Sequence, residues 1–455
     1  MKIHLDPTIF RDYDIRGIYP KQLNEEVFYV LGRALAQYLK VSEIAVGYDC
    51  RLSSASLFKA LTSGIRHQGV NVTDLGNIST EMHYFASGKY QFPANVIISA
   101  SHNPPQYNGL KIVVKGVVPL HGGFGLPEIK KLAEQQDFHP FSPEGKIRKM
   151  DIMPQWITHA LTFIASHKLK PLKVVVDAGN GMGGISWDNL IGKLPVKIIP
   201  LYFAPDGHFP HHLPDPLHEE NLAALKLAIA KHEADLGFAI DGDADRLFVV
   251  DETGKTLSGT TTCAILASAM LQKYGPAPVL YNVVCGRIVP ETVKSLKGTS
   301  IRVRVGHSFI KEAMKKHHAL FGGEHSGHFY FRDNYFAESS LITGLIILEY
   351  LSQRGKPLSS VVTGFDKYRQ SGEINFFVKD KARIEKNVGK EFKDADSFDH
   401  LDGLSVFYPA WWFNLRASKT EPYVRLNIEA DEELILKTNK ERLEKLIYHL
   451  GGKKN

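Results

Sequence analysis

The stretch Leu236-Gly237-Phe238-Ala239-Ile240-Asp241-Gly242-Asp243-Ala244-Asp245-Arg246-Leu247-Phe248-Val249-Val250 places three alternating aspartates between two apolar runs. The runs 236–240 and 247–250 have the length and composition of buried strands. Three carboxylates this close repel one another unless a cation neutralises them, and Mg²⁺ prefers such oxygen ligands. The stretch therefore predicts a strand–loop–strand unit whose loop holds a divalent metal through Asp241, Asp243 and Asp245.

Two other interpretations of this loop are open. Glu252 falls at the twelfth position, as in a calcium-binding EF-hand, but the sixth position is Arg246 where that turn needs glycine. The flanks also resemble strands, whereas an EF-hand needs helices. A solvated acidic turn between two strands is the simpler alternative.

The same order of elements occurs three times along the chain. Each copy has an apolar strand candidate ending in a Gly or Asp turn, a helix-length segment, a second strand candidate, and a third apolar run that feeds a polar loop. This order predicts βαβ units with mostly parallel sheets, whose ligand loops follow the carboxyl ends of strands. The alternative to a true threefold repeat is that the three segments match only as loosely as segments of any α/β protein do. The first strands are 44–49, 173–179 and 278–282, the second are 70–75, 196–201 and 301–305, and the polar loops are 99–105, 241–246 and 322–328.

The tail after Lys367 follows another order: strand, helix, three strands, helix. Its last helix is expected within 432–450, where apolar residues have helical spacing. We therefore predict an α/β fold class, with three similar α/β mixed-sheet domains plus a C-terminal α+β domain. The predicted domains are 1–148, 149–253, 254–366 and 367–455.

Composition excludes several classes of protein. A chain of 455 residues exceeds one core, and 44% hydrophobic with 23% charged residues is typical of a soluble globular protein. The net charge of +6 is too small to indicate a nucleic-acid partner, and the apolar runs are too short to suggest a membrane. Three cysteines without a CxxC pair indicate neither a disulfide framework nor zinc. With no signal-peptide pattern, these features favour the cytoplasm.

The loop Ser99-Ala100-Ser101-His102-Asn103-Pro104-Pro105 carries a hydroxyl that can hold a phosphoryl group. His102 adjoins Ser101 and can orient phosphate oxygens. Lys111 follows on the next strand candidate and can serve as acid or base, because a nearby metal and arginine can depress its pKa. A Ser–His hydrolase is disfavoured, since no Gly-x-Ser-x-Gly surrounds Ser101. A serine that only satisfies its loop and a solvated lysine are the alternatives.

Three further segments suit a phosphorylated, polyhydroxylated ligand. The turn 322–328 is rich in glycine and short polar side chains, and the segment at 306–308 opens a helix whose free amides can bind an anion. The run 416–422 offers a guanidinium, an ammonium and two hydroxyls. Ordinary polar turns are the alternative for each, and the histidine pairs His211-His212 and His317-His318 are expected in solvated turns or helix ends. The candidate substrate-binding residues here are Gly306, His307, Glu324, Ser326, His328, Arg416, Ser418, Lys419 and Thr420.

With these loops in view, the chain resembles the α-D-phosphohexomutase superfamily, and most closely its bacterial phosphomannomutase/phosphoglucomutase group. The match covers essentially the whole chain, in order. It is carried by five motifs: Phe10-Arg11-Asp12-Tyr13-Asp14-Ile15-Arg16-Gly17, then 99–104, 241–246, 323–328 and 416–422. Five motifs in the right order are far more specific than any one of them.

The resemblance implies four domains around a central cleft. It implies an enzyme that moves a phosphoryl group reversibly between the 1- and 6-positions of mannose or glucose phosphates. Phosphorylated Ser101 would donate its group, and the hexose 1,6-bisphosphate, which also serves as activator, would turn over and return the other phosphate. Mg²⁺ would be held by Ser101 and the three aspartates of the loop 241–246.

The resemblance also implies roles for single residues. Arg16 and Lys111 would assist at the reacting phosphate, with His102 beside the serine. Glu324 and Ser326 would hold sugar hydroxyls. The phosphate that does not react would be held by Arg416, Ser418 and Thr420, and Lys419 between them is a further candidate contact. The remaining substrate contacts would be Tyr13, Arg246, Gly306, His307 and His328.

Two positions depart from the family pattern. Lys419 stands where asparagine is common, and Val284 stands where some members carry a lysine that touches the ligand. A phosphoglucosamine mutase is the nearest alternative, but its loops more often carry Gln at the position of His325 and Gly at that of Lys419. A metal-dependent phosphatase and a non-catalytic sugar-phosphate binder are the others. The sequence leaves open the preferred sugar and the oligomeric state.

Overall fold

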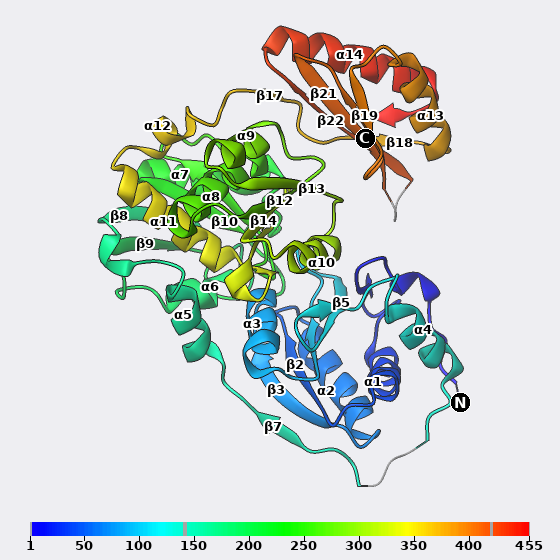
Figure 1. Cartoon of the computed structure of the whole chain (residues 1–455). Helices are drawn as coiled ribbons and strands as arrows, with labels where there is room; N and C mark the ends of the chain where they lie inside the picture. Colours follow the sequence, from blue (N-terminus) through cyan, green and yellow to red (C-terminus); the bar gives the residue numbers. More distant parts are fainter. Residues whose placement is uncertain (1, 140–142, 419–421, 455) are drawn as a thin grey trace. The chain divides into compact units, whose positions relative to one another are not determined.

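The computed structural model describes residues 2–139, 143–418 and 422–454. The chain divides into two compact units, and Figure 1 labels their helices and strands. One unit comprises residues 1–257 and 326–359, and the other comprises residues 258–325 and 360–455. Within the described ranges, every helix falls short of the length or the apolarity that crossing a bilayer requires.

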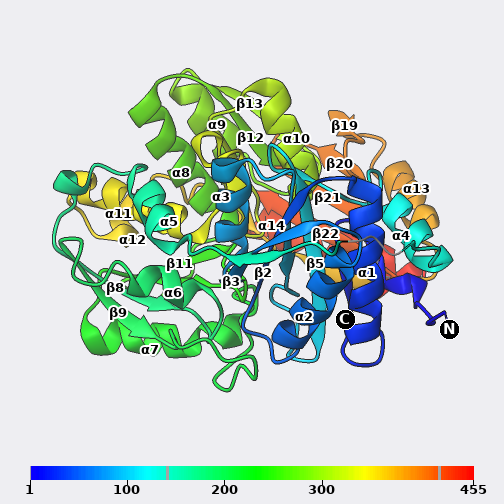
Figure 2. The same ribbon diagram turned by 90° about the horizontal axis from the view of Figure 1, so that it is seen from below.

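The first sheet of the first unit combines parallel and antiparallel strands. Its central strand β2 is parallel to β3 and β4, while β5 runs antiparallel to β4 and to β1. Helices α1 and α2 pack against each other beside this sheet (Figure 2). The strand order is β1 (Ile15–Ile18), β5 (Tyr107–Val114), β4 (Ala94–Ile98), β2 (Glu43–Tyr48), β3 (Asn71–Asn77) and β7 (Ile147–Lys149), with β6 (Val118–Pro119) on β5. The helices are α1 (Glu25–Leu39), α2 (Ser54–Arg66), α3 (Thr80–Tyr90) and α4 (Leu126–Gln135).

The second sheet of this unit ends in an antiparallel hairpin. Strand β8 is parallel to both β9 and β10, and β10 then pairs with β11 in the opposite direction. The later helix α11 packs on α5, α6 and β11. The strand order is β11 (Leu247–Asp251), β10 (Leu236–Ile240), β8 (Leu172–Asp177) and β9 (Val196–Leu201). The other elements are α5 (Met153–Leu161), α6 (Gly183–Asp188), α7 (Ala223–His232), β15 (Phe329–Phe331), β16 (Ala337–Glu338) and α11 (Ser340–Arg354).

The second unit contains two sheets. In one, β12 (Pro278–Asn282) is parallel to β13 (Thr299–Val303) and β14 (Phe321–Gly323). Its helices are α8 (Gly259–Tyr274), α9 (Ile288–Ser295) and α10 (His307–His317). The other sheet is antiparallel in its described pairings, in the order β19 (Ser397–Asp399), β20 (Leu404–Phe407), β21 (Trp411–Ala417), β22 (Tyr423–Ala430), β18 (Ile374–Phe377) and β23 (Lys453–Lys454). The remaining elements are α12 (Leu358–Val362), β17 (Arg369–Gln370, on β22), α13 (Lys381–Glu391) and α14 (Glu433–His449).

The threefold pattern predicted from the sequence is confirmed by the strand pairing. In each copy the first strand lies in the middle, with the second strand on one side and the third on the other: β4-β2-β3, β10-β8-β9 and β14-β12-β13. The third strand leads into the polar loop each time. The α+β tail is also confirmed, with three short strands, β17, β19 and β23, added to the expected order.

Glu81 ties α3 to the start of α11. Its Oε2 accepts hydrogen bonds from Ser339 Oγ at 2.7 Å and from Leu341 N at 3.1 Å. The side chain is completely buried. Burial raises the pKa of the Glu81 carboxyl from 4.5 to about 7, against the opposing effect of these hydrogen bonds. The group therefore makes the stability of the first unit depend on pH.

We expect Glu81→Gln to flatten that pH dependence. A carboxyl with a raised pKa contributes stability below its unfolded pKa and loses this contribution as pH rises through the folded pKa. The shift from 4.5 to about 7 corresponds to about 3 kcal/mol. Urea unfolding at about pH 4 and about pH 8 measures it. The control is Glu26→Gln, an exposed glutamate also in the first turn of its helix. Equal pH slopes in wild type and Glu81→Gln would contradict the prediction.

Candidate active site

Ser101 lies in the turn between β4 and β5, with its side chain directed at the aspartate loop, residues 241–246. Its Oγ donates to Asp241 Oδ2 at 3.2 Å and lies 3.1 Å from His102 Nδ1. The residue is buried, and its backbone is left-handed, with φ of 52°. The serine and the aspartate loop, far apart in the sequence, thus meet in the first unit.

The aspartate loop joins β10 to β11, which confirms the strands predicted from the apolar flanks. Strands on both sides exclude an EF-hand, which needs helices there. Asp241 Oδ1 accepts hydrogen bonds from the backbone N of Asp245 and Arg246, each at 3.1 Å, which closes the loop on itself. A Cβ at Gly242 would lie only 2.5 Å from Ser101 O. Glycine at this position therefore allows the serine loop, residues 99–107, and the aspartate loop to approach each other.

The donor set of this loop fits a divalent metal. One carboxylate oxygen from each of Asp241, Asp243 and Asp245 lies within 4.8 Å of the others, and all three residues are buried. Asp243 Oδ1 has no hydrogen-bond partner among the described residues. Burial and the two neighbouring carboxylates raise the pKa of Asp241 well above its usual range. A cation would relieve this repulsion and satisfy the orphaned oxygen.

Lys111 reaches the aspartate loop from β5. Its Nζ donates to Asp243 Oδ2 at 2.6 Å and to Asp245 Oδ2 at 2.7 Å. Burial opposes the charged form, but the two carboxylates outweigh it and raise the pKa of Lys111 above its ordinary value. Beside these two carboxylates Lys111 is therefore charged and acts as their counter-ion. Its raised pKa is the opposite of the depressed pKa that the sequence suggested. Burial also acts on Asp245, yet Lys111 and His328 hold the pKa of that carboxyl well below its usual range.

His102 and Arg16 border the serine. Burial, together with the positive charges of Arg246 and Arg16, holds the pKa of His102 well below its ordinary value. The imidazole is thus neutral and can share a proton with Ser101 Oγ. Arg16 donates through Nη1 to Asn103 Oδ1 at 2.6 Å and pairs through Nη2 with Asp14. Tyr13 lies in the bend before β1 and is half-buried.

The segment 326–328 lies beside the aspartate loop. Arg246 Nε donates to His328 Nε2 at 3.1 Å, and Leu247 N donates to Gly327 O at 3.1 Å. His328 Nδ1 lies 3.0 Å from Ser326 Oγ. The structure thereby brings Arg246, Ser326 and His328 together, as neighbours of the three aspartates.

The second unit holds the other predicted residues in two groups. Glu324 is buried, and its Oε2 accepts from Asn282 Nδ2 at 3.2 Å and from Gly306 N at 3.4 Å. Gly306 caps α10, and His307 is the first residue of that helix.

The second group lies at the end of β21. Arg416 Nη2 donates to Glu373 Oε2 at 2.9 Å. Ser418 is buried, and its N donates to Tyr423 O at 2.8 Å. Lys419 and Thr420 lie outside the described residues.

Sequence reasoning missed several residues around these groups. Arg51 contacts the serine loop, where its Nη2 donates to Ser101 O at 2.8 Å. Thr80 contacts the aspartate loop, where its Oγ1 donates to Asp243 Oδ2 at 2.6 Å. The sequence did mark Arg51 as a loop residue, because it follows the strand candidate 44–49, at the end of a strand where ligand loops are expected. The expectation of a solvated turn at His212 was wrong, since its Nε2 pairs with the buried Asp177 Oδ2 at 3.1 Å.

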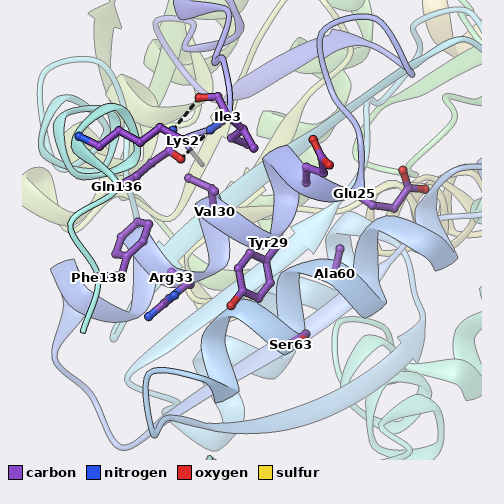
Figure 3. Close-up of a pocket in the computed structure, with 11 residues that line it drawn as sticks. Lys2, Ile3, Glu25, Tyr29, Val30, Arg33, Ala60, Ser63, Gln136 and Phe138 are labelled. Carbon is purple, nitrogen blue, oxygen red and sulfur yellow. Dashed lines mark hydrogen bonds between the residues drawn. The ribbon is translucent and has the colours of Figure 1, made fainter. Parts of the chain in front are cut away.

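A separate pocket lies over α1 and α2 (Figure 3). It encloses about 760 Å³, and Tyr29 and Arg33 of α1 line it together with Gln136 and Phe138. Its lining residues include none of the predicted site residues.

Comparisons with known proteins agree with this geometry. Residues 7–139, 154–254 and 258–368 match alpha/beta/alpha domains I, II and III of phosphoglucomutase/phosphomannomutase, and residues 373–446 match its C-terminal domain. A phosphomannomutase of Vibrio cholerae is 37% identical, covering 97% of this chain and 99% of its own length. A protein of Xanthomonas campestris named "phosphohexose mutases" is 36% identical, with coverages of 96% and 98%. The crystal structure of a phosphoglucomutase/phosphomannomutase family protein from Burkholderia thailandensis superposes with a TM-score of 0.90 at 30% identity, covering 99% of this chain and 100% of that one. Four matching domains in sequence order, with full-length relatives, mean that the chain belongs to the phosphoglucomutase/phosphomannomutase family.

Proposed function

We propose that this chain is a hexose phosphate mutase that transfers a phosphoryl group reversibly between the 1- and 6-positions of mannose and glucose phosphates. The observation that carries the proposal is the contact of Ser101 Oγ with Asp241 Oδ2, at 3.2 Å, in a loop of three buried aspartates. The names of the relatives, phosphomannomutase and phosphohexose mutases, support the same substrate class. A phosphatase would share the serine and the metal but would release free phosphate.

The proposed cycle starts from phosphorylated Ser101. A sugar hydroxyl attacks the phosphorus, the bond to Ser101 Oγ breaks, and a hexose 1,6-bisphosphate forms. After the sugar turns over, Ser101 Oγ attacks the other phosphate and regains a phosphoryl group, which releases the isomeric monophosphate. Added hexose 1,6-bisphosphate would act as the activator, because it phosphorylates a free Ser101. Phosphoryl transfer of this kind depends on positioning and charge neutralisation.

Mg²⁺ is the metal we propose for the aspartate loop, held by Asp241, Asp243, Asp245 and a phosphoserine oxygen. When bound, it neutralises charge that develops on the phosphoryl oxygens. Neutral His102 holds or accepts the proton at Ser101 Oγ. Arg16 binds the reacting phosphate through its guanidinium.

Lys111, charged beside Asp243 and Asp245, gives its proton to the leaving Ser101 Oγ and takes up the proton of the attacking sugar hydroxyl. The remaining site residues bind the sugar phosphate. Glu324 and Ser326 bind sugar hydroxyls, and Arg416 and Ser418 bind the phosphate that does not react. The proposed secondary contacts are Tyr13, Arg246, Gly306, His307, His328, Lys419 and Thr420. The proposed domain boundaries remain 1–148, 149–253, 254–366 and 367–455.

An assay of wild-type protein with Mg²⁺ and a trace of hexose 1,6-bisphosphate tests the proposal. Mannose 1-phosphate, glucose 1-phosphate and glucosamine 1-phosphate are compared. Conversion of the first two to 6-phosphates supports it. Preference for glucosamine 1-phosphate would establish the phosphoglucosamine mutase alternative, and free phosphate without isomer would establish a phosphatase.

Arg416→Lys is expected to raise KM for the hexose phosphates about 10-fold, with a smaller change in kcat. Arginine binds phosphate through two parallel N–H donors, and lysine supplies one point charge, which weakens a charge-assisted contact. Steady-state kinetics measures the effect. Arg442→Lys is the control, since Arg442 is a half-exposed arginine that pairs with Glu391 on the C-terminal helices. An unchanged KM in Arg416→Lys would remove this residue from the phosphate site.

A further inference from the structure

Arg51 binds the backbone of the serine loop, residues 99–107, from inside the protein. Its side chain has no exposed surface. Nη1 donates to Pro104 O at 2.8 Å and to Tyr107 O at 3.0 Å. Nη2 donates to Ser101 O at 2.8 Å and also to Asn103 O. The two Nη groups thus use all four of their N–H donors on four carbonyls, three of them in the turn before β5 and one at its first residue.

The guanidinium that makes these contacts is itself fixed. Its Nε lies 3.3 Å from Asp49 Oδ2, and its Cζ lies 5.2 Å from the centre of the Phe209 ring. Asp49 Oδ1 accepts from Ser54 Oγ at 2.6 Å and from Arg51 N at 3.0 Å. Arg51 is therefore a rigid part of the turn that follows β2.

The contacts hold the serine loop in a conformation that serine does not favour. Ser101 has φ of 52°, a left-handed backbone that persists only when its surroundings enforce it. Ser101 O accepts from Arg51 and also faces Gly242, where a Cβ would lie 2.5 Å away. Ser101 O therefore accepts a hydrogen bond from Arg51 and also packs closely against the aspartate loop.

Lysine cannot reproduce this arrangement. An ammonium has three donors on a single nitrogen, whereas the planar guanidinium presents four Nη–H donors to carbonyls that lie on two sides of it. The chemistry of the loop therefore requires arginine, and not only a positive charge.

We propose that Arg51 is a positioning residue for phosphoryl transfer, which holds the backbone of the serine loop so that Ser101 Oγ stays against Asp241. This inference rests on the proposed function. Arg51 contacts carbonyl oxygens of the loop and needs no contact with the sugar phosphate. Its loss therefore reduces turnover and leaves substrate binding nearly unchanged.

The test compares Arg51→Ala, Arg51→Lys and Arg51→Met with wild type. We expect kcat to fall about 10²-fold with little change in KM, as a misplacement near 1 Å produces. Millimolar guanidinium ion should restore part of kcat to Arg51→Ala by occupying the vacated space. Hydrogen exchange of the amides in 99–110 should become faster in all three variants. Arg66→Met is the matched control, because Arg66 donates to one distant carbonyl, Gly145 O, at 2.7 Å.

Unchanged kcat in Arg51→Met would overturn the proposal, as would a raised KM with preserved kcat or unchanged exchange of 99–110. A failure of guanidinium to restore a folded Arg51→Ala would also count against it. If Arg51→Ala does not fold, Arg51→Lys carries the test through kcat and exchange. A wild type without mutase activity would refute the proposed function, while the exchange experiment would still decide whether Arg51 holds the loop.

Discussion

Ser101→Ala is expected to lower mutase turnover by at least about 10⁴-fold, because the acceptor and donor of the phosphoryl group is lost. Ser101 Oγ is the hydroxyl that touches both Asp241 and His102. The variant should fold, since alanine removes only this oxygen from a buried turn. The assay follows conversion of mannose 1-phosphate to mannose 6-phosphate, and mass spectrometry shows whether the protein carries phosphate.

The matched control for this variant is Ser295→Ala. Ser295 is exposed at the end of α9, where its Oγ donates to Thr292 O at 2.8 Å. Its removal should leave turnover at the wild-type level. Substantial activity in Ser101→Ala, or phosphate still attached at another serine with full turnover, would contradict the assignment of the nucleophile.

Asp243→Asn is expected to lower turnover about 10³-fold and to weaken Mg²⁺ binding. Asp243 supplies a buried oxygen, Oδ1, that has no hydrogen-bond partner in the described part of the chain, and its other oxygen binds Lys111 and Thr80. Asparagine keeps the shape but removes the charge that attracts a hard cation. The Mg²⁺ dependence of turnover and a calorimetric titration with Mg²⁺ measure the two effects.

Asp251→Asn is the control that distinguishes weaker Mg²⁺ binding from a structural change in the β10–β11 hairpin. Asp251 is equally buried and closes the turn after β11, where its Oδ1 accepts from Thr253 N at 2.9 Å and Lys255 N at 3.0 Å. This control should leave Mg²⁺ affinity unchanged. Equal Mg²⁺ affinity in wild type and Asp243→Asn would refute the metal assignment.

The repeated strands could be predicted because their signals are local. Runs such as 173–179 and 236–240 are apolar, have strand length, and end at Gly or Asp, so the order of β8, β9 and β10 follows from the chain itself. The grouping of later segments is not local. Helix α11, far along the chain, packs on α5 and α6, and Glu81 binds its first turn. No periodicity in the sequence reports such a contact.

In the site, too, the residues marked by local sequence could be predicted, whereas contacts between distant segments could not. Ser101, Lys111 and the three aspartates stand in loops and strands whose polar character marks them in the sequence, and the structure brings these residues together. The position of Arg51 after a first strand marked it as a loop residue, but its role was missed because its partners are backbone carbonyls, which residue types do not reveal. The protonation of Lys111 could not be inferred either, because its pKa depends on two carboxylates that only the fold places beside it.

Transfer of a labelled phosphoryl group from the protein to a sugar phosphate is the decisive test of a phosphoserine intermediate at Ser101. The protein is labelled on Ser101, freed of excess label, and mixed with unlabelled glucose 1-phosphate and Mg²⁺. If Ser101 donates the phosphoryl group, the label leaves the protein and appears in hexose 1,6-bisphosphate and hexose 6-phosphate. Label that appears as inorganic phosphate, or that stays on the protein while isomer forms, would contradict it.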